Sequence, residues 1–111
     1  MKIIYNSVIP FPGFMAINMF GLMFVRNEYK GKVSDRTINH ESIHTEQMKE
    51  LGYIPFYIIY LIEWFIRLFG KGNAYRQISF EQEAYDNERN MFYLETRKRY
   101  SWLKYIKKKK R

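Results

Sequence analysis

The sequence predicts an α+β protein that is mainly helical, with three helices and a small N-terminal β-sheet. Residues 1–33 are rich in β-branched and aromatic residues and are interrupted by proline and glycine, a composition typical of short strands joined by turns. The rest of the chain carries helix-capping signals and apolar side chains in three segments, at 34–51, 55–69 and 79–99. The strands are therefore expected to precede the helices, as in an α+β fold.

Two N-terminal stretches are expected to form the sheet. Lys2–Val8 is the first. Phe14–Arg26 contains one or two strands with a turn or bulge at Gly21, where the missing side chain permits a tight bend. The polar run Asn27–Lys32 is expected to be a loop.

The first helix is predicted at residues 34–51. Ser34, Asp35 or Thr37 can cap its N-terminus, and Gly52 lies where a left-handed residue commonly ends a helix. Both ends of this helix are thus marked by the local sequence.

A second helix is predicted at about 55–69, opened by Pro55, whose missing amide hydrogen is not needed in a first turn. The segment is apolar nearly all round, which predicts a helix buried in the core, with a helix lying partly in lipid as the alternative. Glu63 and Arg67 are four residues apart and can pair on one face. These charges, and a length below the about 20 apolar residues of a bilayer span, argue against a helix that crosses a membrane.

The third helix is expected to begin at Ser79, after the loop Gly70–Asn73. Gln82 follows Ser79 by three residues and completes a capping box. This helix is expected to end near Arg99.

Charge is unevenly distributed along the chain. We place a single domain at residues 1–99 and a basic C-terminal tail at 100–111. Residues 97–111 hold nine Lys and Arg and no acid, whereas residues 1–96 hold ten Lys and Arg against eleven Asp and Glu. A cationic tail favours an anionic membrane as partner, although it is also typical of a solubilising tail. Nucleic acid is not expected, because no recognised binding signature accompanies the charges. Three apolar residues can form a short amphipathic turn in the tail: Trp102, Leu103 and Ile106.

No signal peptide is visible at the N-terminus, which favours a cytoplasmic protein, with peripheral membrane contact through the aromatic helix and the basic tail. The chain has no cysteine, so any metal site must use histidine and carboxylate ligands.

The segment His40-Glu41-Ser42-Ile43-His44 matches the H-E-x-x-H pattern and contains both histidines of the chain. Residues i and i+4 of a helix share one face, so both imidazoles can reach one ion, which we expect to be zinc. Glu41 lies beside them and can act as general base for a metal-activated water that attacks a carbonyl. The alternative is a polar helix face with two solvated histidines.

A zinc site of this kind needs a third protein ligand and leaves one position open for water. Glu81 is the preferred candidate, because a glutamate near the start of another helix can complete the coordination from the opposite side. Tyr85 lies one turn later on the same face and can hydrogen-bond a ligand or a developing oxyanion. Glu63, which follows His44 by nineteen residues, and Glu83 remain alternative ligands.

Two motifs resemble those of the gluzincin metallopeptidases. The segment His40–Gln47 resembles an HExxHxxQ motif, and Phe80–Tyr85 resembles the E-x-E-A-D motif that follows it in those enzymes. The likeness is greatest to the small proteins called minigluzincins and to short uncharacterised HExxH proteins of bacteria. It implies a minimal zincin-like fold and a zinc-dependent peptidase with a peptide or protein substrate. It also implies that an edge strand within residues 14–26 binds the substrate by strand addition.

The resemblance assigns His40, His44 and Glu81 as zinc ligands and Glu41 as general base. Tyr85 stands where the family motif has an aspartate, and Asp86 follows it, so the resemblance does not carry over the contact from that aspartate to a ligand histidine. Some small members of the group look latent, with a C-terminal segment over the active site, and the tail of this chain could act likewise. The alternative function is a non-catalytic, metal-stabilised module that binds a membrane or a partner.

Overall fold

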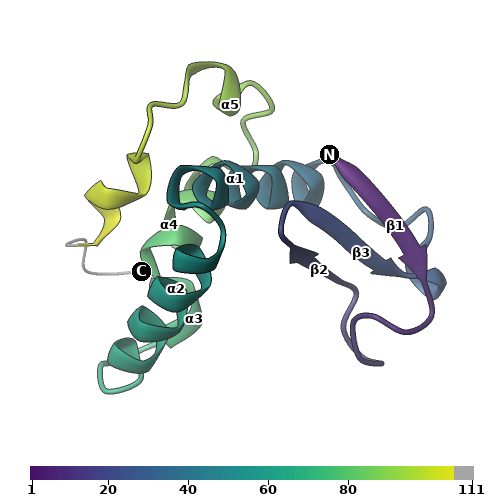
Figure 1. The fold of residues 1–111 in the computed structure, drawn as a ribbon, viewed down its shortest axis with the longest axis horizontal. Helices are drawn as coiled ribbons and strands as arrows, with labels where there is room; N and C mark the ends of the chain where they lie inside the picture. The colour runs from purple at the N-terminus through teal and green to yellow at the C-terminus, as the bar shows by residue number, and fades with distance from the viewer. Residues whose placement is uncertain (107–111) are drawn as a thin grey trace.

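The computed structural model describes residues 1–106, and the basic run at 107–111 lies outside the described residues. The fold is mixed α and β, with a small N-terminal sheet followed by helices, as expected (Figure 1). Five α-helices are present in the described part of the chain, instead of the three predicted. The elements are β1 (Lys2–Asn6), β2 (Ala16–Met19), β3 (Leu22–Arg26), the 3-10 helix η1 (Asn27–Tyr29), α1 (Asp35–Leu51), α2 (Ile54–Arg67), α3 (Ala74–Gln77), α4 (Ser79–Asn87), α5 (Tyr93–Thr96) and the 3-10 helix η2 (Ser101–Tyr105).

The sheet has the strand order β1-β3-β2, with β1 parallel and β2 antiparallel to β3. Phe20 and Gly21 form the hairpin between β2 and β3, and both have positive φ, as a two-residue hairpin turn of the primed type requires. A Cβ atom on Gly21 would also lie 3.4 Å from Cγ2 of Thr45, so glycine allows the hairpin to pack closely on α1. This arrangement leaves β2 at an edge of the sheet, beside α1.

The predicted ends of α1 are confirmed. The Ser34 hydroxyl accepts a hydrogen bond from the amide of Thr37, and Gly52 ends the helix in the left-handed conformation at φ 76°. The buried face of α1 is unusually polar for a core-facing helix: Asn39, His40, Ile43, His44, Gln47 and Met48. Buried polar groups need partners, so this face must be built around a polar site.

The expectation that the aromatic helix is buried in the core is wrong. Phe56 is the one residue of α2 classed as buried, and the apolar side chains on the opposite face are exposed. Pro55 does lie in its first turn, as predicted. The contacts of Glu63 and Arg67 are also different from the expected pair: Glu63 accepts hydrogen bonds from Ser79, and Arg67 donates to the carbonyl of Ile106.

The predicted third helix is divided into α4 and α5. Asn39 of α1 donates its side-chain amide to the carbonyl oxygens of Asn87, Glu88 and Asn90, which satisfies the open C-terminal end of α4. This contact comes from a distant part of the chain, which explains why local sequence did not reveal the break. The additional helix α3 is capped by the side chain of Asn73.

The capping box predicted at Ser79 does not form. Ile78 precedes the first turn of α4, and both the amide and the hydroxyl of Ser79 donate to the carboxylate of Glu63, at 2.8 and 2.6 Å. A glutamate from α2 therefore caps α4, and its negative charge lies at the positive end of the helix dipole.

The described part of the predicted tail packs onto the other helices. Residues 101–105 form η2, in which Trp102 and Tyr105 are buried, whereas Leu103 and Ile106 are exposed. The ring of Trp102 lies 4.7 Å from that of Phe80 between centroids. The buried core cluster unites α1, α2, α4 and η2 through Met48, Phe56, Ile78, Phe80 and Trp102.

No helix within residues 1–106 is long and apolar enough to cross a membrane.

Candidate metal centre

Three side chains from two helices converge in the interior. α1 presents His40 and His44 one turn apart, and α4 presents Glu81 from the opposite side. All three are buried, and one ligand atom of each lies within 4.8 Å of the others. Oε1 of Glu81 lies 3.1 Å from Nε2 of His40 and 3.1 Å from Nε2 of His44. The structure thus brings together the three residues preferred as metal ligands.

The proton on His44 is placed by its neighbour Gln47. The Gln47 amide nitrogen donates to the carbonyl of Phe80 and to Glu83, so its oxygen faces Nδ1 of His44 at 2.8 Å. That oxygen can only accept, which puts the imidazole proton on Nδ1. Nε2 therefore carries a lone pair directed toward Glu81.

His40 is oriented in the same way by Glu88. The Glu88 carboxylate lies 2.7 Å from Nδ1 of His40, and Arg36 approaches the same carboxylate at 3.6 Å. A carboxylate behind a ligand histidine fixes the ring and increases the basicity of the other nitrogen. Glu88 therefore orients His40 from the end of α4.

These atoms could hold a cation between them. Nε2 of each histidine and a carboxylate oxygen of Glu81 face one another in a buried space, and within the described chain Nε2 of His44 has no hydrogen-bond partner. Burial opposes a charge on His44, but the charges of Glu81 and Glu41 outweigh it and raise the pKa of His44 to about 9. Burial likewise opposes the charge on Glu81, yet the histidines and Tyr60 hold the pKa of its carboxyl well below its usual range. The centre is therefore built for a bound positive charge.

The donor set fits zinc. Two imidazole nitrogens and one carboxylate oxygen form a familiar three-ligand set for catalytic zinc, with a fourth position left for water. Zinc–ligand bonds of about 2.0–2.1 Å imply ligand atoms about 3.3 Å apart in a tetrahedron, close to the two spacings of 3.1 Å to Glu81. The other oxygen of Glu81 accepts a hydrogen bond from Tyr60 at 2.6 Å, so the carboxylate is held in a fixed orientation.

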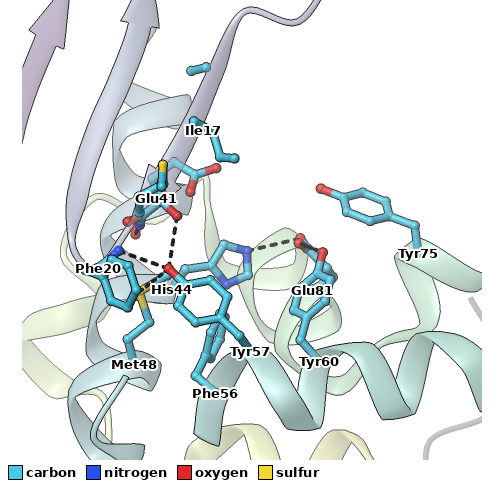
Figure 2. A pocket seen from close by; sticks show the side chains of 13 residues that line it. Ile17, Phe20, Glu41, His44, Met48, Phe56, Tyr57, Tyr60, Tyr75 and Glu81 are labelled. Atoms are coloured by element: carbon cyan, nitrogen blue, oxygen red, sulfur yellow. Dashed lines mark hydrogen bonds and ion pairs between the residues drawn. The ribbon is translucent and has the colours of Figure 1, made fainter. Parts of the chain in front are cut away.

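The metal centre opens into a cleft of about 530 Å³ between the sheet and α2 (Figure 2). Its lining is largely apolar and combines the edge strand with four helices: Ala16, Ile17, Asn18, Met19, Phe20, Glu41, His44, Met48, Phe56, Tyr57, Tyr60, Tyr75 and Glu81. Residues 93–106 contribute nothing to this lining. Arg97 in this segment binds the carboxylates of Glu50 and Glu83.

Two polar side chains fix the walls of the cleft relative to each other. The side-chain amide of Asn18 in β2 donates to the carbonyl of Glu41 and to the hydroxyl of Thr45, which ties the edge strand to α1. The Tyr57 hydroxyl of α2 accepts from the amide of Phe20 and donates to the carbonyl of Asn18. The edge strand is thus held beside the helix that carries Glu41.

The two predicted catalytic side chains lie in different surroundings. Glu41 lines the main cleft and is half-buried. Tyr85 packs its ring edge-on against His40, with a centroid distance of 4.6 Å, and Arg76 covers its other side at 3.8 Å. Tyr85 is therefore placed to support a ligand, whereas Tyr75 extends toward the cleft beside Glu81 (Figure 2).

The alternative ligands have other partners. Glu63 caps α4, and Glu83 is fully buried in an ion pair with Arg97 and hydrogen bonds from Gln47 and Tyr93.

Sequence reasoning missed Tyr60 and Glu88, which contact Glu81 and His40, and Tyr75, which lines the cleft. Glu88 lies just outside the E-x-E-A-D-like motif, about two helical turns after Glu81, a spacing that could have indicated it. Nothing in the local sequence distinguishes Tyr60 or Tyr75 from the other aromatic residues around them.

Comparison of this chain with known protein families, curated proteins and solved structures finds no match.

Proposed function

We propose that this protein is a zinc-dependent peptidase of the gluzincin type. The observation that carries the proposal is the buried cluster of His40, His44 and Glu81, because His44 and Glu81 line a cleft that Glu41 also lines. A metal site that serves folding alone is commonly closed by four protein ligands, whereas three ligands facing a cleft leave a position for water and substrate.

Zinc bound here would supply a Lewis acid that polarises a substrate carbonyl and lowers the pKa of a water. Glu41 accepts the proton of the attacking water and transfers it to the leaving amine, the role of a general base and then a general acid. Burial and the charge of Glu81 raise the pKa of Tyr75, so its hydroxyl stays protonated and can donate to a developing oxyanion. Glu88 and Gln47 keep both histidines in the tautomer that leaves Nε2 unprotonated.

The edge strand β2 is the feature that favours a peptide as substrate. Its residues Ala16–Met19 line the cleft, and the strand pairs on one side only, with β3. An extended peptide can add to the free side of β2, which would align its backbone across the metal ligands. The apolar lining favours substrates with large hydrophobic side chains next to the cleaved bond.

The test compares the parent protein with Glu41→Gln. Each is prepared without a histidine tag and assayed for bound zinc and for cleavage of a mixed peptide library, read by mass spectrometry. We expect both proteins to bind one zinc, with cleavage about 10²–10⁴-fold slower in Glu41→Gln, because the base is lost while the ligands remain.

The matched control is Glu46→Gln, which changes an exposed glutamate of the same helix whose ion-pair partner is Lys49. It should cleave at the parental rate. Zinc binding without any cleavage in the parent would instead favour a metal-stabilised module, and a parent that binds no zinc would refute the metal centre itself.

A further inference from the structure

Helix α2 has its polar and apolar faces reversed relative to an ordinary surface helix. The face directed at the rest of the protein carries Phe56, Tyr60, Glu63 and Arg67, which are three or four residues apart and so share one side of the helix. Each polar residue of this inward face has a partner in the described chain. Tyr60 donates to Glu81, Glu63 accepts from Ser79, and Arg67 donates to the carbonyl of Ile106.

The opposite face of α2 is apolar and open. Its members share the same helical spacing, and each is more than half exposed: Ile54 55%, Ile58 53%, Leu61 63%, Ile62 54% and Phe65 59%. We call these five residues the apolar stripe. Phe69, 79% exposed, extends it just beyond the helix. A contiguous apolar surface of this kind on a helix indicates a site of contact with lipid or with another protein.

The sequence that follows the stripe carries basic residues and no acid as far as Phe80. From residue 64 to residue 80 the chain contains Arg67, Lys71 and Arg76 and no acid. The Arg67–Ile106 hydrogen bond of 2.9 Å brings the chain back to the same end of α2. The sequence then continues directly into Lys107-Lys108-Lys109-Lys110-Arg111. These five basic residues lie outside the described residues and follow Ile106 directly in the sequence.

We propose that α2 docks this protein onto an anionic lipid surface, with the apolar stripe in the headgroup–acyl boundary and the basic residues on the headgroups. At about 1.5 Å per residue the helix is about 21 Å long, so it lies along the surface and does not span the bilayer. Apolar insertion combined with basic charge is the pairing that gives stable peripheral binding.

The charge pattern favours lipid over a second copy of the chain. A symmetric dimer through the stripe would bring the same surface of both subunits together, and with it two sets of positive charges. An anionic bilayer instead neutralises those charges while covering the stripe.

The test is co-sedimentation with vesicles of phosphatidylcholine alone and of phosphatidylcholine mixed with phosphatidylserine. We expect the parent to bind the mixed vesicles and to bind the neutral ones at least about tenfold more weakly, with the difference shrinking at high salt. The double variant Ile62→Gln/Phe65→Gln should lose binding to both. A variant with Lys107–Lys110 all changed to Gln should bind the mixed vesicles more weakly, with a smaller difference between the two kinds of vesicle.

The matched control is Phe92→Gln. Phe92 is 69% exposed and precedes α5, which Figure 1 shows on the far side of α1 from α2, so this variant should bind as the parent does. Unchanged melting temperatures would show that the variants remain folded. Equal binding of the parent to neutral and anionic vesicles, or no binding at all, would overturn the proposal. So would a dimer, seen by light scattering, that Ile62→Gln/Phe65→Gln converts to monomer.

Discussion

Each ligand histidine is held by a side chain on its Nδ1 that no zinc ion would touch. Gln47 holds His44, and Glu88 holds His40. Both partners are acceptors at this position, so both rings present Nε2 to Glu81 before any metal arrives. Such preorganisation lowers the entropy that metal binding must overcome.

We expect Glu88→Ala to weaken zinc binding by about 10–100-fold, because His40 loses the carboxylate that orients it. The dissociation constant would be measured by competition with a chromophoric chelator. Glu95→Ala, which removes an exposed glutamate of α5, serves as the control and should leave affinity unchanged. Equal affinity in the parent and Glu88→Ala would show that α1 alone orients the ring.

The metal-free protein should lose stability as the pH rises from about 6.5 to about 9. The pKa of His44 is raised from 6.5 to about 9 in the folded chain, so folding favours its protonated form. The resulting stabilisation is complete below pH 6.5 and disappears as the pH passes the folded pKa. Melting temperatures of the chelator-treated protein across this range would test the slope. Zinc displaces the same proton, so zinc affinity should rise over this range, and a metal-free protein with no such slope would contradict the assignment.

At this scale the sequence predicted the ligands better than their supports. His40, Glu41 and His44 share one helical turn, so spacing alone placed them together. Glu81 required a second motif. Tyr60 reaches Glu81 from another helix, and no local pattern reports a contact that only tertiary packing creates.

Among the elements, α2 joins three parts of the molecule. Tyr57 fixes the hairpin, Tyr60 holds a metal ligand, and Glu63 caps the helix that carries this ligand. The apolar composition of α2 suggested burial, and the prediction failed because composition does not say which face turns inward. Here the few polar residues turn inward, since each has a polar partner on α4 or near η2.

Glu63→Ala should lower the free energy of unfolding by about 1–2 kcal/mol, because α4 loses the carboxylate that accepts from Ser79 at its N-terminus. Zinc content should be unchanged, since Glu63 lies outside the ligand set. Denaturant unfolding and zinc analysis on the same sample would check both. Loss of zinc with intact folding would restore Glu63 as a ligand.

Helix ends set by neighbouring residues were predictable, and those set at long range were not. Ser34 and Gly52 marked α1 correctly, because each acts on adjacent backbone. The end of α4 depends on Asn39, which precedes it by nearly fifty residues. A sequence pattern that continues past such a point predicts one long helix where the fold contains two.

In the whole molecule, η2 completes the core. Trp102 packs on Phe80, and the neighbouring residue of Phe80 is the ligand Glu81. Arg97 reaches Glu83, which in turn binds the Gln47 that orients His44. Residues 97–105 therefore support the helix that carries Glu81 and the side chain that orients His44.

Trp102→Ala should reduce the free energy of unfolding by about 3–5 kcal/mol, the usual cost of removing a large buried aromatic side chain. Leu103→Ala, at an exposed position of the same 3-10 helix, should change it by no more than about 0.5 kcal/mol. Chemical denaturation of both variants would measure the difference. Equal stability of Trp102→Ala and the parent would mean that η2 does not contribute to the folded core.

The contacts of Arg97 and Trp102 with the residues around His44 and Glu81 have a consequence for folding during synthesis, because Arg97 and Trp102 are made later. His40, His44 and Glu81 all leave the ribosome before the residues that support them. A nascent chain that exposes all three ligands still lacks the ion pair to Glu83 and the ring beneath Phe80. If the proposed centre binds metal, stable loading is expected only after residue 102 has emerged and η2 has packed on α4.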